Sequence, residues 1–399
     1  MNLKSGFPFW LIKHGLPYSY QKLSHNKKTH VLVVGGGITG ALVAFQLQDA
    51  GIETCVVDAR TIGLGSTCAS TSLLQYEIDT PLHELIAKIG KTKAQKAYRL
   101  CEESINTLEQ ISRKIKFEDF ERKKSLYTAH HPQKINFLKK ELEARKQNGH
   151  MVSWLDDKEI QQKYKLTSKA GILSQTAAQT NAYLYAHALH QHSIKQGVHV
   201  YDRTNIAHFK PTGKRVKCIT DEGFTINAKW VVFATGYEAI KYLDKPIVRL
   251  QSTYAIISEE NKIYKNICNN TLIWNTANPY VYLRKTADGR VLIGGRDENF
   301  YDPIKRDNLL DKKASMLAND FSKMYNGLKL KTEFTWTGTF GSTDDGLPYI
   351  GVYPKMPYAL FALGFGGNGI TFSQIAADII TTKVAKGKDL YESLFGFSR

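Results

Sequence analysis

A glycine-rich turn between an apolar strand and a helix constrains the fold of this chain more than any other feature. Gly35, Gly37 and Gly40 form the pattern G-x-G-x-x-G. In this pattern the first glycine permits a tight turn, the second lets the backbone approach a pyrophosphate, and the third lets helix and strand pack closely. The sequence predicts a strand–turn–helix–strand unit, formed in order by Val31–Val34, Gly35–Gly40, Ala41–Ala50 and Thr54–Val57.

An acidic residue at the end of the second strand indicates what this turn binds. Asp58 directly follows that strand, where its carboxylate can accept hydrogen bonds from ribose hydroxyls. A carboxylate there would repel a 2′-phosphate, which disfavours NADP. The helix would direct its free N–H groups and the positive end of its dipole at the phosphates. We therefore predict a dinucleotide site that includes Gly35, Gly37, Ile38, Thr39, Gly40, Asp58, Ala59 and Arg60.

Three later segments favour FAD over NAD, although an NAD-dependent Rossmann dehydrogenase is the alternative. A loop of small and hydroxyl-bearing residues follows Asp58, a central strand ends at Thr235–Gly236, and a second glycine loop, Gly364–Gly369, precedes the last predicted helix. Such loops let a pyrophosphate, a ribityl chain and a flavin ring approach the backbone. The predicted contacts are Ser66, Thr67, Ser70, Thr71, Ser72, Thr235, Gly236, Gly366, Gly367, Asn368, Gly369, Ile370 and Thr371.

Together these motifs resemble the D-amino-acid oxidase (DAO) superfamily of FAD-dependent oxidoreductases, in the branch that contains glycine oxidase, sarcosine oxidase and D-amino-acid dehydrogenase. The segments that carry the resemblance are residues 31–72, 179–185, 230–236, 280–298 and 336–372. The resemblance implies non-covalent FAD, with its ADP half on Gly35–Gly40 and Asp58 and its ring between Ser66–Ser72 and Gly366–Ile370. It also implies oxidation of an amine or amino-acid-derived C–N bond by hydride transfer to flavin N5, after which the imine hydrolyses.

Four positions depart from members of that branch. Phe340 and Gly367 occupy positions at which some members carry basic residues that bind the substrate carboxylate, which argues against recognition of simple α-amino acids. Gly338 matches the cysteine to which sarcosine oxidase attaches its flavin, so we predict no covalent link there. Leu292 matches an oxygen-activating lysine. We therefore expect a dehydrogenase with another, unidentified electron acceptor rather than an oxidase.

Aromatic strands later in the chain supply the candidates for substrate contact. Alternation along one strand places Tyr280, Tyr282 and Arg284 on the same face. If that face meets the flavin, the aromatic rings could hold an amine cation and the arginine an acidic group. We predict Tyr282, Arg284 and Tyr254 as catalytic residues, against the alternative that they belong to ordinary sheet core and surface. Arg296 is a weaker candidate for binding a carboxylate.

The order of the predicted elements favours an α/β fold, with a Rossmann-type FAD-binding domain and a second, β-rich α+β substrate domain inserted in pieces. The 399 residues suit two domains. We expect a discontinuous FAD-binding domain and a substrate domain in two segments. The FAD-binding domain comprises residues 1–90, 166–240 and 341–399, and the substrate domain comprises residues 91–165 and 241–340. Residues 1–29 are predicted to be an irregular lead-in to the first strand.

The net charge of +17 allows a second class of function, an RNA-associated flavoprotein. Acidic residues interrupt the basic ones repeatedly and no nucleic-acid-binding motif accompanies them, so we expect a basic surface without a specific nucleic-acid partner. No apolar run is long enough for a transmembrane helix, and the N-terminus lacks the pattern of a signal peptide. The five cysteines form no CxxC pair. We expect a cytoplasmic protein with reduced thiols and no metal site.

Overall fold

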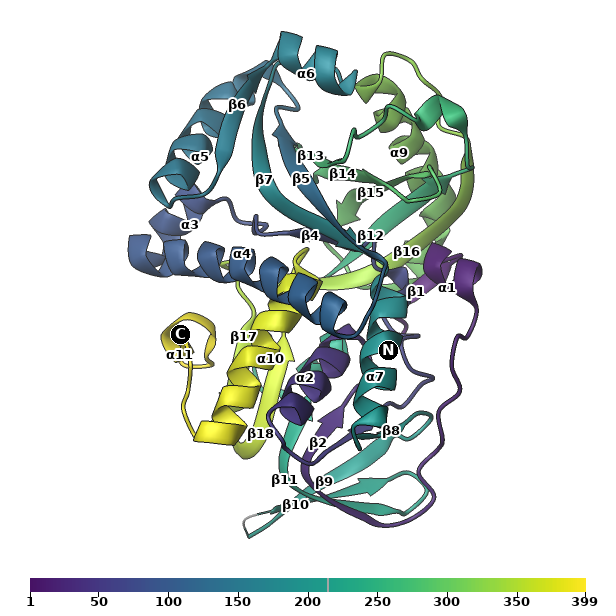
Figure 1. Cartoon of the computed structure of the whole chain (residues 1–399), viewed down its shortest axis with the longest axis vertical. Helices are drawn as coiled ribbons and strands as arrows, with labels where there is room; N and C mark the ends of the chain where they lie inside the picture. Colours follow the sequence, from purple (N-terminus) through teal and green to yellow (C-terminus); the bar gives the residue numbers. More distant parts are fainter. Residues whose placement is uncertain (214) are drawn as a thin grey trace.

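The computed structural model describes residues 1–213 and 215–399 and arranges them around two sheets (Figure 1). The smaller sheet has the order β17–β18–β11–β2–β3–β8, and β10 and β9 extend it from β11. Its strands are β2 (Lys27–Val34), β3 (Thr54–Val57), β8 (His199–Tyr201), β9 (Ile206–Thr212), β10 (Arg215–Thr220), β11 (Thr225–Phe233), β17 (Tyr349–Tyr353) and β18 (Met356–Leu363). The strands from β18 to β8 run parallel, as expected of apolar strands that are covered on both faces.

Three helices cover one face of the smaller sheet. α2 (Ile38–Asp49), α7 (Ala182–Lys195) and α10 (Gly369–Lys386) lie side by side across it (Figure 1). α2 is buried over most of its length because it packs between α7 and α10 as well as on the strands. The opposite face is covered by the β9–β10 hairpin, from which the ring of Phe209 lies 4.9 Å from that of Phe233. The predicted strand–turn–helix–strand unit is present as β2–α2–β3.

The larger sheet has the order β1–β16–β12–β15–β14–β13–β5–β7–β4, and β6 pairs with β7. Its strands are β1 (Lys4–Gly6), β4 (Leu73–Gln75), β5 (Phe120–Thr128), β6 (Val152–Asp156), β7 (Ala170–Thr180), β12 (Arg249–Ser258), β13 (Thr271–Asn275), β14 (Val281–Lys285), β15 (Val291–Glu298) and β16 (Thr332–Ser342). α9 (Leu310–Met324) covers one face of β12 and β15 and buries an apolar cluster there. The other face of these strands is free to line a cavity.

The remaining helices connect the two sheets or close their ends. α4 contacts α10 as well as β4 and β7, so it joins the helical layer of the smaller sheet to the larger sheet (Figure 1). The helices are α1 (Phe9–His14), α3 (Leu82–Ile89), α4 (Lys91–Lys114), α5 (Ile135–Gln147), α6 (Asp157–Tyr164), α8 (Pro303–Asn308) and α11 (Glu392–Phe395). Two 3-10 helices, η1 (Thr67–Ala69) and η3 (Gly236–Tyr242), lie next to the site described below.

The first 29 residues are more regular than predicted. β1 pairs with β16 at the edge of the larger sheet, and α1 buries Phe9 and Trp10. Elements this short have a weak local signal, and tertiary contacts stabilise them. β1, β4 and β7 lie in segments that we assigned to the FAD-binding domain, yet they pair in the larger sheet. The domain boundaries themselves stay a prediction.

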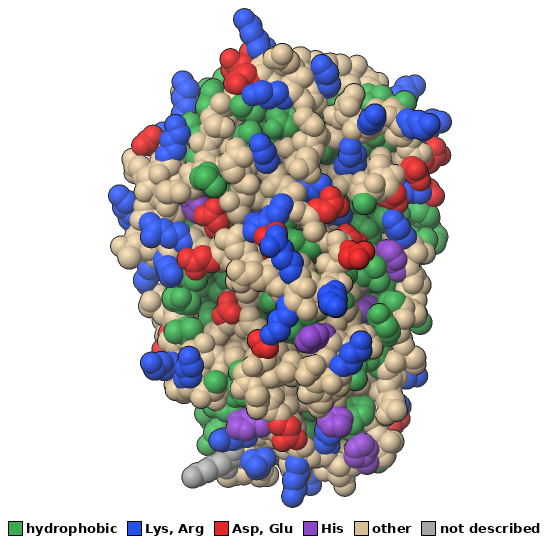
Figure 2. Space-filling view, viewed as in Figure 1, with side chains coloured by type: hydrophobic (Ala, Val, Ile, Leu, Met, Phe, Trp, Pro, Cys, Tyr) green, Lys and Arg blue, Asp and Glu red, His purple; other side chains and the backbone are tan. Residues whose placement is uncertain are grey.

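Charges of both signs are mixed on the surface. On the face in Figure 2, lysine and arginine side chains are spread widely, with aspartate and glutamate among them. Within residues 1–213 and 215–399, no helix is long and apolar enough to cross a membrane. The same residues bring together no group of three histidine, cysteine or acidic side chains that could hold a metal ion. All five cysteines are buried as free thiols.

Candidate cofactor and substrate site

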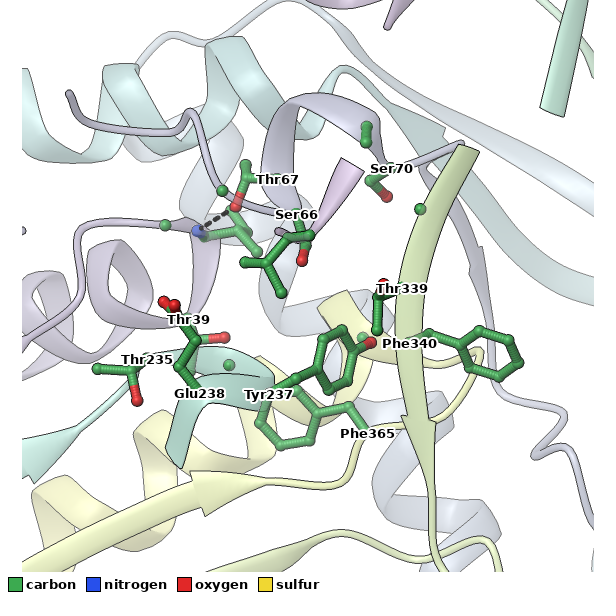
Figure 3. A pocket seen from close by; sticks show the side chains of 18 of the residues that line it. Thr39, Ser66, Thr67, Ser70, Thr235, Tyr237, Glu238, Thr339, Phe340 and Phe365 are labelled. Atoms are coloured by element: carbon green, nitrogen blue, oxygen red, sulfur yellow. Dashed lines mark hydrogen bonds between the residues drawn. The ribbon is translucent and has the colours of Figure 1, made fainter. Parts of the chain in front are cut away.

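A long cavity joins the carboxyl ends of the parallel strands to the open face of the larger sheet. It begins at the glycine turn after β2, passes the loop that contains η1, and ends against β12, β14, β15 and β16. The glycine loop before α10 forms another wall. Figure 3 shows Tyr237 and Phe365 projecting into this cavity, with Phe340 on the far side of β16 from them. Ligands of open α/β sheets bind at this end of the strands.

The glycine turn is packed too tightly for a side chain at Gly35 or Gly40. Gly35 has a φ of +109°, and a Cβ there would lie 2.4 Å from the carbonyl oxygen of Ala234. A Cβ on Gly40 would lie 1.8 Å from the carbonyl oxygen of Gly35. The backbone N–H of Ile38, at the start of α2, donates to Thr67 Oγ1 at 3.1 Å (Figure 3). Gly35 and Gly37 also line the cavity and have no side chains, so their backbone is accessible to a pyrophosphate, as the ADP half of FAD requires.

Asp58 is held by the backbone at the end of β3. Its carboxylate accepts from the N–H of Gly36 at 2.7 Å and from the N–H of Arg60 at 2.8 Å. Burial raises its pKa to about 6. The guanidinium of Arg60 is paired with both carboxylate oxygens of Glu238, each at 2.8 Å. Asp58 is thus fixed where a ribose hydroxyl could donate to it, and the charge of Arg60 is balanced within the protein.

Two tryptophans hold the hydroxyl-rich loop at the other end of the cavity. Trp10 Nε1 donates to the carbonyl of Ser70 at 2.8 Å, and Trp336 Nε1 donates to the carbonyl of Ala69 at 2.9 Å. Trp10 comes from α1, so the N-terminal segment helps to shape the site. Opposite this loop, α10 begins at Gly369 without a side-chain cap, and its first residues, Gly369 and Ile370, line the cavity. A helix N-terminus there can stabilise negative charge on a bound ring.

The predicted cofactor contacts are largely brought together. All of them line the cavity except Gly40, Asn368 and Thr371. Gly40 instead permits the close packing of α2 on the turn. The Asn368 side chain donates to the carbonyls of Gln75 and Glu77 at 3.1 and 2.8 Å. Thr371 Oγ1 donates to the carbonyl of Asn368 at 3.0 Å. Asn368 and Thr371 therefore hold the glycine loop in place rather than face the cavity.

Two of the three predicted catalytic residues, Tyr282 and Tyr254, line the cavity, but the side chain of Tyr254 packs into the cluster under α9. Tyr254 is 1% exposed and packs with Ile256 and Phe321 under α9, because alternation along β12 directs it to the opposite face. The fully buried guanidinium of Arg284 donates to the carbonyls of Ser72 and Thr180, both at 2.8 Å. These positions correct our prediction that the two residues face a substrate.

The surroundings of Arg284 indicate a structural role. Its guanidinium lies 5.2 Å from the ring centre of Trp10. Burial lowers its pKa to about 10, and the charges of Asp119 and Glu121 oppose that shift. It is held between the hydroxyl-rich loop and β7, so it stabilises the loop from behind. Arg296, the weaker candidate, forms an ion pair with Asp320 on α9 and also faces away from the cavity.

The sequence analysis missed Asp297, which an irregularity in β15 turns toward the cavity. Ser252 pairs with Glu298 and Tyr254 pairs with Gly295. Between these two pairs β15 therefore has one more residue than β12. Gly295 and Arg296 absorb it with φ angles of +130° and +58°. As a result Arg296 points to α9, and the next residue, Asp297, lines the cavity. Such bulges occur beside active sites, and the glycine pair Gly294–Gly295 inside a strand was the available signal.

The two ends of the cavity differ in charge. Among the described residues that line it, the basic ones are Arg60 and Lys241. Arg60 follows Asp58, and Lys241 lies on η3 with Glu238, so both belong to the nucleotide end. At the sheet end the charged lining residue is Asp297, whose pKa burial raises to about 7. The sheet end therefore offers a carboxylate and aromatic rings but no cation.

Comparisons with known proteins agree with this geometry. A family model described as FAD dependent oxidoreductase, DAO, matches residues 30–383. Glycine oxidase of Bacillus licheniformis is 23% identical over 370 residues, which cover 90% of this chain and 93% of that protein. Gamma-glutamylputrescine oxidoreductase of Escherichia coli (strain K12) is 23% identical, in an alignment that covers 90% of this chain and 84% of that protein. The crystal structure of L-proline dehydrogenase from P. horikoshii superposes with a TM-score of 0.79 at 20% identity and covers 92% of this chain and 97% of that one.

Proposed function

This chain belongs to the DAO family of FAD-dependent oxidoreductases, and from that premise we propose that it is an amine dehydrogenase. In this proposal it oxidises a C–N bond and passes the electrons to an acceptor other than O2. The observation that supports the proposal best is the single cavity that connects the nucleotide turn to the open face of the larger sheet. Two relatives are named for glycine and for gamma-glutamylputrescine, and an amine fits both names.

The chain itself would bind and orient both reactants. FAD, when bound, supplies the acceptor for the hydride that leaves the substrate carbon. The turn at Gly35–Gly40 and Asp58 would hold its ADP half, and the loops at Ser66–Ser72 and Gly366–Ile370 would hold its ring. The N-terminus of α10 would stabilise negative charge on the ring. The face of β12, β14 and β15 would place the substrate over that ring and exclude water.

Two features favour a dehydrogenase over an oxidase. Reduction of O2 begins with formation of an anion, which a nearby cation stabilises. Among the described residues that line the sheet end of the cavity there is no lysine or arginine. Leu292 is fully buried in an apolar cluster with Ala255 and Trp336. Neither the cavity nor that strand position therefore offers the positive charge that would promote reaction with O2.

The proposed function predicts how the bound FAD responds to amines. We expect the purified yellow protein, mixed without oxygen with a panel of primary and secondary amines, to lose its visible absorbance with at least one of them. Its colour should return slowly in air and quickly with the artificial acceptor dichlorophenolindophenol. Alcohols of matched carbon skeleton serve as controls and should leave the spectrum unchanged. Bleaching by no amine would contradict the proposal, and recolouring in air as fast as with the dye would mean an oxidase.

A further inference from the structure

The surrounding protein stabilises the charged form of Asp297 only in part. Its Oδ1 is buried and has no hydrogen-bond partner among the described residues, while a hydrogen bond with the side chain of Thr253 stabilises the charged form. The ammonium of Lys313, on α9, acts on it but is already bound by the carboxylate of Glu298 and by the carbonyl of Arg296. An unpaired carboxylate inside a cavity costs free energy until a cation is placed against it. A positively charged ligand would therefore supply the counter-charge that Asp297 lacks.

The residues around Asp297 suit such a ligand. Tyr280 and Tyr282 line the same end of the cavity, with their ring centres 5.8 Å apart. Aromatic ring faces attract cations. A second carboxylate, Asp79, accepts from the hydroxyl of Tyr280 at 3.1 Å and from the N–H of Gly367 at 2.7 Å, and thereby holds that ring in place. The ring of Tyr282 lies across Gly294, where a Cβ would come within 2.4 Å of its hydroxyl oxygen.

The same arrangement disfavours an anionic substrate group. A substrate carboxylate at this end would meet Asp297 with no arginine or lysine to receive it among the described lining residues. Like charges repel each other strongly in a site of low polarity. We propose that the substrate is an amine without an α-carboxylate, that Asp297 binds its ammonium group, and that the Asp297 carboxylate accepts a proton from it. This inference rests on the proposed amine oxidation and assigns its substrate class.

The proton step prepares the amine for oxidation. An ammonium N–H gives its proton to a carboxylate oxygen of Asp297, which leaves a neutral amine with a free electron pair and a neutral carboxyl group. That pair forms the C=N bond as a hydride leaves the neighbouring carbon for the bound oxidant. Because a protonated amine has no such pair, oxidation requires the proton to leave first.

Binding of matched ligands tests the inference without turnover. We expect butylamine to perturb the visible spectrum of the FAD-loaded enzyme at concentrations about tenfold lower than norvaline, which is the same amine with an α-carboxylate, or butyrate. In the Asp297→Asn variant the dissociation constant for butylamine should rise by about tenfold to hundredfold, the usual loss when one partner of a desolvated charge pair is removed. The Asp311→Asn variant removes an exposed aspartate on α9 and should bind butylamine like the unaltered protein.

The outcomes separate this inference from the proposed function. Equal affinity of butylamine for the Asn variant and the unaltered protein, or tighter binding of norvaline than butylamine by the unaltered protein, would overturn the role of Asp297. If an amine still bleached the flavin in that case, the proposed function would stand. If butylamine bound through Asp297 but no amine bleached the flavin, amine oxidation would fail while the cation site remained.

The thermal stability of the protein without an added amine gives a second test of the role of Asp297. Burial raises the pKa of Asp297 from 3.8 to about 7, so the charged carboxylate opposes folding above about pH 7 and this penalty disappears as the pH falls toward 4. A hydrogen bond with Thr253 and the charge of Lys313 lower that pKa, and the charge of Asp79 raises it. Tyr280, just before β14, and Tyr282, on β14, lie near the same carboxylate. The Asn variant should therefore have a higher Tm than the unaltered protein at about pH 8.5, and the difference should shrink at about pH 5. A lower Tm for the variant at both pH values would contradict an unbalanced charge.

Discussion

Replacing Gly40 with alanine is expected to remove bound FAD and to destabilise the protein by more than about 3 kcal/mol. The added Cβ would lie 1.8 Å from the carbonyl oxygen of Gly35, a separation that forces backbone rather than a flexible side chain to move. Either α2 moves off the turn or the turn opens, and both changes disturb the cradle for the pyrophosphate. The measurements are the ratio of flavin absorbance to protein absorbance after purification, and the Tm with and without added FAD.

Gly65→Ala is the matched control for this effect. Gly65 also lines the cavity, but its added Cβ would contact only Leu3 Cδ1, at 3.8 Å, which is ordinary van der Waals contact. We expect this variant to retain flavin and to change the Tm little. An alanine at position 40 that keeps a full complement of FAD would show that the turn tolerates a wider helix–strand spacing than the structure has. Loss of FAD in both variants would point to crowding of the cofactor instead of distortion of the turn.

The nucleotide end of the site could be predicted from sequence because its chemistry is local. Gly35, Gly37 and Gly40 lie on one turn, and Asp58 follows the next strand along the chain, so their spacing alone places them together. The glycine loop before α10 carries the same kind of signal, since glycines beside a helix N-terminus suit close approach of a ligand. These segments need no knowledge of the larger sheet to be recognised.

The substrate end could not be predicted in this way, because it depends on pairings across the larger sheet. Simple alternation placed Tyr282 correctly on the cavity face, but the position of Tyr254 on β12 relative to β14 is not contained in either strand alone. Arg284 shares the face of Tyr282 yet lies beyond the cavity, against Ser72 and Thr180. Asp297 reaches the cavity only through the bulge in β15, which reverses the expected alternation.

A buried ion-pair network supports the glycine loop from a distance. Arg145, on α5, is fully buried; its Nε donates to Glu141 Oε1 at 2.7 Å and its Nη1 lies 3.2 Å from Glu77 Oε1. The carbonyl of Glu77 accepts from the side chain of Asn368, in the glycine loop before α10. Burial alone would raise the pKa of Glu141, but the charge of Arg145 and hydrogen bonds from His83 lower it to about 2. The network thus links α5 to the wall of the cavity.

Replacing Arg145 with methionine is expected to cost about 3–5 kcal/mol of unfolding free energy, because two buried carboxylates lose their counter-charge. The matched control is Arg113→Met, since Arg113 also pairs with a glutamate four residues earlier, Glu109, at 2.7 Å but is 76% exposed on its side chain. Exposed pairs of this spacing contribute less than about 1 kcal/mol. Denaturant unfolding of the two variants measures the difference, and bound flavin reports whether the glycine loop is disturbed.

The effect of Arg145→Met should also depend on pH in a defined direction. A carboxylate whose pKa is lowered in the folded protein stabilises it above its ordinary pKa, and this stabilisation is lost as the pH falls through the lowered value. For Glu141 this stabilisation should be lost over the pH range from 4.5, its ordinary pKa, down to about 2, its pKa in the folded protein. The difference between the unaltered protein and the variant should therefore narrow on acidification through this range. Equal losses for the Arg145 and Arg113 variants at neutral pH would mean that burial does not distinguish the two pairs and that Arg145 does not anchor the cavity wall.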